Sequence, residues 1–443
     1  MTEAALTIES LDQEGRGIGR ADGKVIFVEG ALAGERVSYL SRRKKASYEI
    51  AEVVEVLSES ASRVTPRCPH FGVCGGCSMQ HLDVATQVAV KQRVLEDNLW
   101  HVGRLRAQTM LAPIHGPAWR YRFRARLSVR YVEKKGGVLV GFHEKRSSFV
   151  ADMRECHVLP AHVSAMLVPL RGLVASLSIA RRLPQIELAI GESSSARELE
   201  TILVLRILEP LSRDDEQKLA AFASEHEIVF WLQPKGPDSI RPLAADAPSE
   251  LHYALPEFDV RLSFRPTDFT QVNPAINRVL VGRALRLLEV EPHERVADLF
   301  CGLGNFSLPI ARQAREVVGV EGSKTMIERA AANARTHGLE SKTSFVAADL
   351  FEVGAAFFEK LGPFDKMLID PPREGAIAVV NALVAFGEGA PRRIVYVSCN
   401  PSTLARDAAV LVHEGKYTLR DAGIVNMFPQ TSHVESIAVF VHE

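Results

Sequence analysis

The chain has 443 residues, which exceeds the usual size of one domain and predicts two or three domains. Hydrophobic residues make up 47% and charged residues 24%, as in globular proteins that bury a sizeable core. The formal net charge of −1 excludes a chain that binds nucleic acid through overall basicity. The sequence has neither an apolar run of about 18 residues nor the start of a signal peptide, so we expect a cytoplasmic protein with no membrane partner.

Residues 1–57 alternate apolar and polar side chains in short runs, which predicts a small β-barrel. The segment EGRGIGRADGKVIFV is rich in glycine, but a strand follows the glycines. A dinucleotide-binding loop needs a helix at that point, so this interpretation is rejected. The segment resembles a TRAM domain, an OB-like module of RNA-modifying enzymes, and barrels of this class often bind nucleic acid. A barrel without such a role is the alternative.

Residues 58–264 show a mixed pattern that predicts an α+β central domain. Helices are expected near 84–102, 161–178 and 213–225, and strands in FRARLSVRYV, VLVGFH, PQIELAIG and ETILVLRIL. Four arginines, at every second position from Arg120 to Arg126, alternate with apolar or small residues. On a strand, they would form one basic face suited to a phosphate backbone. A solvated charged face is the alternative.

Four of the six cysteines form a pattern typical of metal ligands. Cys68, Cys74 and Cys77 have the spacing C-x5-C-x2-C, and Cys156 follows much later. Structural disulfides are not expected in a reducing cytoplasm. Three clustered cysteines with a distant fourth resemble the ligands of an iron–sulfur cluster, but four thiolates also suit tetrahedral zinc. The spacing alone does not decide between the two metals.

Residues 265–443 alternate helices with buried strands, which predicts a doubly wound, Rossmann-like α/β domain. In VADLFCGLGNFSLPIA, a strand ends at Asp298, a glycine loop follows, and a helix begins. The next strand ends in Glu321, where an acid can bind ribose hydroxyls, and a third ends near Asp349, beside the expected adenine position. This order of acids is similar to class I methyltransferases. A Rossmann oxidoreductase is the alternative, although no hydride-transfer constellation is present.

Two further strands end in residues suited to catalysis. LIDPPREG places Asp370 before two prolines, and Arg373 stands where many amino-group methyltransferases carry an aromatic residue. VYVSCNP places Cys399 on the same rim. A thiolate that adds to C6 of uracil makes C5 nucleophilic toward a methyl donor, and a base then removes the C5 proton. The site must therefore favour the thiolate, and Glu435 is the expected base with His433 as its rival.

Four segments together closely resemble the RNA uracil-C5 methyltransferases over essentially the whole chain: LIDPPREG, YVSCNP, FPQTSHVE and FRPTDFTQVNPAIN. The resemblance implies S-adenosylmethionine as methyl donor, Cys399 as nucleophile and Glu435 as base. It also implies that Phe269 stacks on the target base. The residues that it places around the cofactor and the uracil are Gln271, Phe300, Asn305, Glu321, Asp349 and Asp370.

The ribosomal-RNA branch of this family carries the C-x5-C-x2-C spacing and a late fourth cysteine, whereas the tRNA branch lacks them. The resemblance therefore implies a [4Fe–4S] cluster on Cys68, Cys74, Cys77 and Cys156, and a monomer that acts on a structured loop of 23S ribosomal RNA. A tRNA uracil-C5 methyltransferase and a non-catalytic RNA-binding or ribosome-assembly factor are alternatives. Cytosine-C5 methylation is disfavoured because the fourth strand lacks a Pro-Cys pair. Radical enzymes typically carry C-x3-C-x2-C instead.

Overall fold

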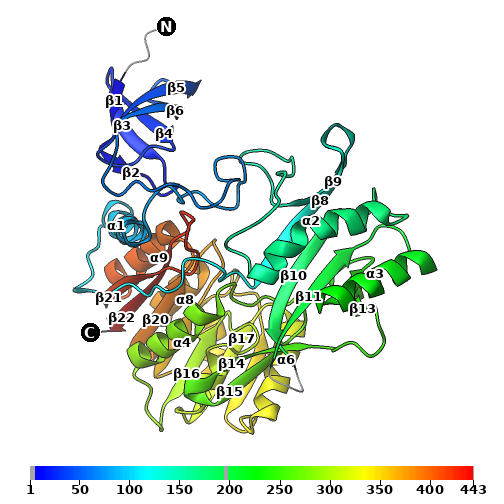
Figure 1. Ribbon diagram of the computed structural model, residues 1–443. Helices are drawn as coiled ribbons and strands as arrows, with labels where there is room; N and C mark the ends of the chain where they lie inside the picture. The colour runs from blue at the N-terminus through cyan, green and yellow to red at the C-terminus, as the bar shows by residue number, and fades with distance from the viewer. Residues whose placement is uncertain (1–4, 194–197, 443) are drawn as a thin grey trace.

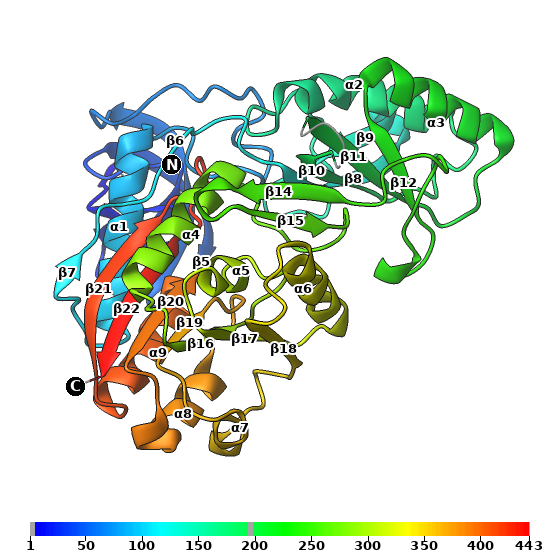
Figure 2. The same ribbon diagram turned by 90° about the horizontal axis from the view of Figure 1, so that it is seen from below.

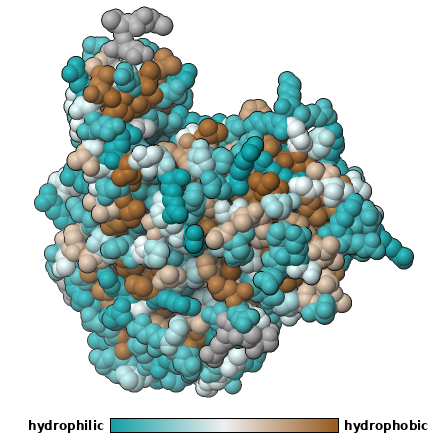
Figure 3. Space-filling view, viewed as in Figure 1, coloured by the Kyte–Doolittle hydropathy of each residue, from teal (hydrophilic) through white to brown (hydrophobic). Residues whose placement is uncertain are grey.

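The computed structural model describes residues 5–193 and 198–442, which form three β-sheets with helices around them (Figure 1). The N-terminal sheet, drawn in blue, stands at one end of the molecule next to α1 (Val84–His101). Hydrophilic residues predominate on the face drawn in Figure 3. Of the helices in the described part of the chain, none is long and apolar enough to span a membrane.

The N-terminal sheet pairs six strands in the order β1–β5–β6–β4–β3–β2, as the alternating pattern predicted. Its glycines are explained by close packing between strands. A Cβ on Gly17 would lie 2.8 Å from a methyl carbon of Ile8, and one on Gly19 would lie 2.7 Å from the carbonyl oxygen of Thr7. The strands are β1 (Ala5–Thr7), β2 (Ser10–Leu11), β3 (Gly17–Ala21), β4 (Lys24–Glu29), β5 (Arg36–Lys44) and β6 (Tyr48–Ser58).

The central sheet has the order β13–β12–β11–β10–β14–β15, and β8 pairs with both β10 and β9. Two helices pack on it and on each other, α2 (Ala161–Ser176) and α3 (Arg213–His226). The strands are β8 (Arg124–Val132), β9 (Gly137–Gly141), β10 (Gln185–Glu192), β11 (Leu199–Arg206), β12 (Val229–Gln233), β13 (Arg241–Pro242), β14 (Leu251–Leu255) and β15 (Val260–Phe264). The short 3-10 helices of this part are η1 (Glu133–Lys135), η2 (Pro237–Ser239) and η3 (Pro256–Phe258); a further one, η4 (Gly387–Gly389), follows in the C-terminal part.

The four alternating arginines do not form the basic strand face that the sequence predicted. β8 begins only at Arg124, because Arg120 has a φ of 58° that interrupts the extended chain. The Nη2 group of Arg124 donates to the carbonyl of Asp268 at 2.7 Å. Arg126 pairs with Glu187 at 3.1 Å. The Nε of Arg122 donates to the carbonyl of Arg124 at 3.1 Å. Three of the four guanidinium groups are therefore engaged with the protein, and the predicted phosphate-binding face is not present in this form.

The C-terminal sheet confirms the doubly wound α/β prediction. Its order is β18–β17–β16–β19–β20–β22–β21–β7, parallel from β18 to β20, with β22 antiparallel to β20. The central strands β16, β17, β19, β20 and β22 are mostly apolar and buried, as expected of a sheet covered on both faces, whereas the edge strands β18 and β7 are more exposed. The sheet comprises eight strands in the described part of the chain. They are β16 (Arg295–Leu299), β17 (Glu316–Glu321), β18 (Thr343–Ala347), β19 (Lys366–Ile369), β20 (Arg393–Ser398), β21 (Tyr417–Val425), β22 (Glu435–His442) and β7 (Thr109–Met110).

Helices cover both faces of this sheet (Figure 2). One face packs against α4 (Pro274–Leu288), α5 (Ser307–Ala311) and α6 (Lys324–Thr336). The other face packs against α7 (Ala355–Leu361), α8 (Ile377–Phe386) and α9 (Pro401–His413). Helix α1 lies on α9 and β7 pairs with β21, although the sequence placed both segments in the central domain.

Candidate active site

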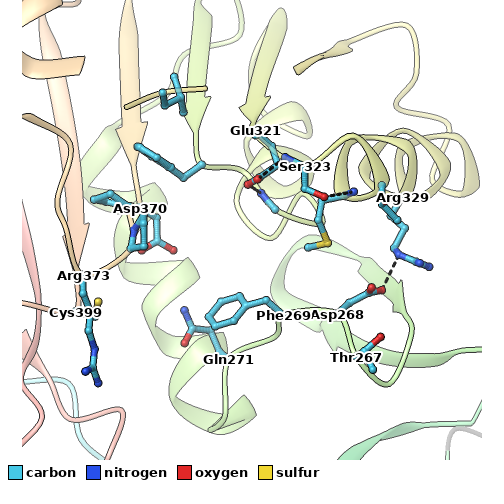
Figure 4. A pocket seen from close by; sticks show the side chains of 18 of the residues that line it. Thr267, Asp268, Phe269, Gln271, Glu321, Ser323, Arg329, Asp370, Arg373 and Cys399 are labelled. Atoms are coloured by element: carbon cyan, nitrogen blue, oxygen red, sulfur yellow. Dashed lines mark hydrogen bonds and ion pairs between the residues drawn. The ribbon is translucent and has the colours of Figure 1, made fainter. Parts of the chain in front are cut away.

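A cavity of about 760 Å³ lies at the carboxyl ends of the parallel strands of the C-terminal sheet. Figure 4 shows Asp370, Arg373 and Cys399 on one side of it and Glu321 with Ser323 across from them. Phe269 and the rival base His433 also line the cavity. The structure thus brings seven predicted site residues to one place: Gln271, Phe300, Glu321, Asp349, Asp370, Cys399 and Glu435.

Asn305 is the predicted site residue that is not among those lining the cavity. Its Oδ1 accepts hydrogen bonds from the Tyr253 hydroxyl and from the amide of Asn277, both at 3.0 Å. Its Nδ2 donates to Asn277 Oδ1 at 3.1 Å. The side chain therefore connects the glycine loop to α4 and β14, and its contact with the cofactor stays a prediction.

The glycine loop after β16 turns sharply beneath the cavity. Phe300 has a φ of 62°, which non-glycine residues rarely adopt, and Gly302 and Gly304 also have positive φ. The backbone N–H of Gly302 donates to Glu321 at 3.3 Å, which ties the loop to the end of β17. A Cβ on Gly304 would lie 2.5 Å from the side chain of Leu308. Gly302 lines the cavity with its backbone, and Gly304 allows α5 to pack closely against the loop.

Two buried carboxyl groups lie at the ends of β16 and β19: Asp370 lines the cavity, and Asp298 lies close enough for its charge to interact with Asp370. Burial raises the pKa of Asp298 to about 7, although the Ser307 hydroxyl donates a hydrogen bond to its carboxylate. Burial also raises the pKa of Asp370 to about 7. Asp370 is fixed by its backbone N–H, which donates to the carbonyl of Leu299 at 3.2 Å. These carboxyl groups favour a cationic ligand, because a positive charge would offset their cost of ionisation in a low-dielectric site.

Cys399 and Glu435 are placed side by side by strand register. Ser398 at the end of β20 pairs with Ser436 near the start of β22, so the residues next to them meet at one rim. Glu435 is buried, and this burial raises its pKa to about 8. Cys399 is half-buried. Burial, reinforced by Glu435, raises the pKa of the Cys399 thiol to about 11. This environment favours the thiol and differs from the predicted site that favours a thiolate.

Arg373, in the loop after β19, is bonded to residues that follow β20 and lies beside His433, which precedes β22. Its carbonyl accepts hydrogen bonds from the Asn400 amide at 3.1 Å and from the Thr403 hydroxyl at 3.2 Å. Its Nη2 lies 3.2 Å from Nδ1 of His433. Burial lowers the pKa of His433 to about 4, and the Arg373 charge acts in the same direction. The imidazole is therefore neutral and weakly basic at neutral pH.

The loop that carries Phe269 and Gln271 is fixed at its base and exposed at its tip. Asp268 pairs with Arg329 at 2.6 Å and accepts the backbone N–H of Arg265 at 2.6 Å. Phe269 is 71% exposed, which is unusual for an aromatic side chain in a well-held loop. Figure 4 places it and Gln271 between the Cys399 side and the Asp268–Arg329 pair.

A second pocket, small and mostly apolar, is lined by Cys68, Cys74, Cys77 and Cys156. All four are buried, and burial raises the pKa of each thiol, to about 12 for Cys77 and about 11 for Cys156. The N–H of Gly76 donates to Cys74 Sγ at 3.3 Å. The predicted ligands thus share one pocket, yet within the described ranges no three His, Cys, Asp or Glu side chains are arranged to hold a metal ion.

Sequence analysis missed Lys91, which lies on α1 and approaches the active site from outside the C-terminal segment. It is 1% exposed, and its Nζ donates to Asn426 Oδ1 at 2.7 Å and to the carbonyl of Phe428 at 2.9 Å. One signal was available. Lys91 stands four residues before Leu95 and three before Val94, both buried, so it falls on the apolar face of its helix.

Comparisons with known proteins agree with this geometry. Residues 254–443 match the family described as tRNA (Uracil-5-)-methyltransferase, and residues 2–38 match the TRAM domain. The 23S rRNA (uracil(1939)-C(5))-methyltransferase RlmD of Burkholderia ambifaria is 64% identical, over 98% of this chain and 94% of that protein. The protein of the same name from Bordetella avium is 62% identical, over 99% of this chain and 91% of that protein.

A solved structure has the same overall fold. It is the Pyrococcus abyssi tRNA (uracil-54, C5)-methyltransferase in complex with S-adenosyl-L-homocysteine. The alignment covers 99% of this chain and 100% of that chain, with a TM-score of 0.72 and 22% sequence identity. The likeness shows a methyltransferase α/β fold, in agreement with the strand order of the C-terminal sheet.

Proposed function

We propose that this chain, which belongs to the family of RNA uracil-C5 methyltransferases, transfers a methyl group from S-adenosylmethionine to C5 of a uridine in 23S ribosomal RNA. The observation that carries the proposal is the adjacent placement of Cys399 and Glu435 on the rim of a cavity that also contains the glycine loop. The relatives over 60% identical, whose names specify 23S rRNA, support this substrate over tRNA.

The residues around the glycine loop fit the cofactor. Bound S-adenosylmethionine supplies an electrophilic methyl group on a sulfonium cation. Both acids line the cavity: Glu321, at the end of β17, would bind the ribose hydroxyls, and Asp349, after β18, would bind the adenine. The rings of Phe300 and Phe351, 5.8 Å apart, offer apolar surface for a flat base. The buried acids Asp298 and Asp370 favour the positive charge of the sulfonium.

Catalysis then depends on two groups of the chain. The Cys399 thiol releases its proton to solvent in the cavity as its sulfur bonds to C6 of the uracil; the C5=C6 π electrons move toward C5 and O4, which makes C5 nucleophilic. After C5 has gained the methyl group, the Glu435 carboxylate takes the C5 proton. The bond between sulfur and C6 then breaks, which releases 5-methyluridine and restores the cysteine. Because the thiol is the favoured form of free Cys399, its proton must leave as the sulfur attacks C6.

Glu435 suits the role of base better than His433. Its pKa of about 8 lies near the pH at which a general base works best. His433, with a pKa of about 4 and a ring nitrogen within 3.2 Å of the Arg373 guanidinium, has a much weaker affinity for a proton. We assign His433 to the positioning of Arg373.

Phe269 and Gln271 suit recognition of the target base. An exposed aromatic ring beside the cavity offers a stacking surface for a base taken out of its helix. The Gln271 amide offers both a donor and an acceptor, which match the polar edge of uracil.

We propose further that Cys68, Cys74, Cys77 and Cys156 ligate a [4Fe–4S] cluster. Four buried thiols with raised pKa values need a strong cation before they ionise, and a cluster supplies one. Sulfur ligands of one zinc ion would lie about 3.8 Å apart, because each Zn–S bond measures about 2.3 Å. A [4Fe–4S] cluster is larger than a single ion, and its four iron atoms each bind one thiolate, so iron and zinc content measured on the purified protein distinguishes the two.

The cysteine loop is also tied to the catalytic loop. The N–H groups of Ser78 and Met79 each donate to the Gln430 carbonyl at 3.0 Å. The Ser78 hydroxyl accepts the N–H of Ser432 at 2.8 Å. A cluster that orders residues 68–77 would therefore hold the segment that leads into Glu435. Its role in this proposal is structural.

The proposed function is tested by methylation in vitro. Purified protein is incubated with labelled S-adenosylmethionine and either 23S rRNA or tRNA, both from cells that lack the modification. Label confined to 5-methyluridine of 23S rRNA supports the proposal. Label in tRNA alone would identify the tRNA alternative, and no label in either RNA would contradict the assignment.

A further inference from the structure

We propose that Lys91 of helix α1 is a positioning residue that keeps Glu435 in the form able to accept the C5 proton. This inference rests on the proposed function, because it concerns the step that Glu435 performs. It adds a residue from outside the methyltransferase segment, 344 positions earlier in the chain, to the control of the base.

The geometry around Lys91 leaves its charge only partly compensated. Its Nζ donates to two neutral oxygens, Asn426 Oδ1 at 2.7 Å and the Phe428 carbonyl at 2.9 Å. Both acceptors lie in the loop from β21 to β22, and Val425, just before that loop, pairs directly with Glu435. The ammonium group is thus held one residue from the cross-strand partner of the base.

Glu435 likewise lacks a partner that would stabilise its charged form. Its Oε2 is buried and has no hydrogen-bond partner among the residues that the structure describes. An unpaired buried carboxylate is costly, and it is normally stabilised by a nearby opposite charge. Burial lowers the pKa of Lys91 to about 7, and the charge of Glu435 opposes that shift. Lys91 in turn opposes the rise in the pKa of Glu435. Each group therefore stabilises the charged form of the other.

Other charged groups near the pair act in known directions. Asp370 raises the pKa of Glu435 and thus works against Lys91. Glu435 raises the pKa of Cys399, whose thiol faces the same rim. The groups around this rim that carry or can carry charge are Lys91 from α1, Asp370 and Arg373 after β19, Cys399 after β20, His433 and Glu435 before and in β22, and Arg122 before β8.

Gln87 provides an internal comparison for Lys91. It lies one turn earlier on α1 and holds the same catalytic loop, because its Oε1 accepts the Gln430 N–H at 2.9 Å and its Nε2 donates to Gln430 Oε1 at 3.1 Å. Gln87 thus fixes the loop without any charge. If loop position were the whole contribution of α1, a second neutral side chain would serve at position 91, and the desolvation cost of an ammonium group would be avoided.

The test compares Lys91→Met with the wild type and with Gln87→Leu as the matched uncharged control. Methyl transfer and the amount of covalent protein–RNA adduct are measured between about pH 6 and about pH 9.5. Glu435 accepts the C5 proton only as a carboxylate, so loss of the nearby positive charge moves its working range upward. We expect Lys91→Met to turn over about tenfold more slowly than the wild type at pH 7, to accumulate adduct there, and to approach the wild-type rate at the highest pH.

Gln87→Leu should change the rate by the same factor at every pH, because only loop position is altered. A pH-independent loss in Lys91→Met, or no loss, would overturn the inference. If Lys91→Met does not fold, Asn426→Ala is tested in its place, because it keeps the Lys91 amine and removes its side-chain acceptor. We expect a smaller upward shift of the pH profile for this variant. An unchanged pH profile would be the contrary result. Wild-type protein that fails to methylate rRNA would instead contradict the proposed function.

Discussion

Cys399 and the group Cys68, Cys74, Cys77 and Cys156 are buried to different extents and have very different neighbours. Cys399 is half-buried on the rim of a cavity of about 760 Å³, beside Glu435 and within the influence of Asp370 and Arg373. The other four line a small pocket that they share with apolar side chains. Burial raises the pKa of the thiol in both places.

The difference shows how the surroundings of a cysteine decide its use. A nucleophile needs room for a substrate and nearby groups that can accept or donate protons. The cavity beside Cys399 offers space, and Glu435 and Asp370 are such groups. A metal ligand needs several thiols close together and protected from water, and the four cysteines share one buried pocket. Raised pKa values of the thiols do not distinguish the two proposed roles, because both sites have them. The space beside the thiol and the charged groups around it distinguish the two roles.

The largest effect is expected for Cys399→Ala. Loss of the nucleophile should reduce methyl transfer by roughly 10⁴-fold or more, because C5 cannot then be activated. Binding of S-adenosylmethionine should be retained, since Glu321, proposed to hold its ribose, lies across the cavity from Cys399. Radiolabel transfer and calorimetry measure the two properties. Substantial turnover by this variant would exclude a covalent mechanism through Cys399.

Cys156→Ala should act on stability rather than chemistry. We expect loss of bound iron and of its visible absorbance, and a fall of roughly 3 kcal/mol in the free energy of unfolding. Methyl transfer by the folded fraction should decrease far less than in Cys399→Ala. Iron analysis and denaturant titration of anaerobically purified protein are the measurements. A colourless wild-type protein with one zinc ion would contradict the cluster.

Phe269→Ala should weaken the binding of RNA. Stacking of a base on an aromatic ring contributes about 1–3 kcal/mol, so the KM for RNA should rise about tenfold. Phe269→Tyr keeps the ring and serves as the matched control, and the KM for S-adenosylmethionine should be similar in both variants. An unchanged KM for RNA in Phe269→Ala would show that this exposed ring does not meet the substrate.

Asn305→Ala should have the smallest effect on the active site. The variant loses the hydrogen bonds to Tyr253 and Asn277, so the free energy of unfolding should fall by about 1 kcal/mol. Affinity for S-adenosylmethionine should change less than about threefold, because the side chain points to α4 and β14. A large loss of affinity without loss of stability would return Asn305 to the cofactor pocket.

Much of the fold was predictable from the sequence, because the strands of the C-terminal sheet are apolar runs that end in polar loops. Cys399, Asp370 and Glu321 could be placed on one rim, since parallel strands end at the same edge. The N-terminal sheet was predictable from alternation and glycine. Its close approaches at Gly17 and Gly19 explain the glycine-rich motif.

The remaining features depend on tertiary contacts. The arginine alternation predicted a strand, but the N–H groups of Arg120 and Arg122 bond to the carbonyls of His157 and Val158 instead of to a sheet. The direction of Asn305 depends on a loop in which Phe300 has positive φ. The charge of Lys91 reaches Glu435 only because α1 packs on α9 and β21, far along the chain. Patterns local to the sequence do not encode these contacts.

The most direct test of covalent uracil methylation in this cavity is made with Glu435→Gln. A glutamine cannot take the C5 proton, so the methylated base should stay bonded to Cys399. We predict a protein–RNA adduct that survives a denaturing gel and whose mass equals protein plus RNA plus one CH2, because the methyl group is gained and the thiol proton is lost. A variant that binds both substrates but releases methylated RNA freely, or forms no adduct, would contradict the account.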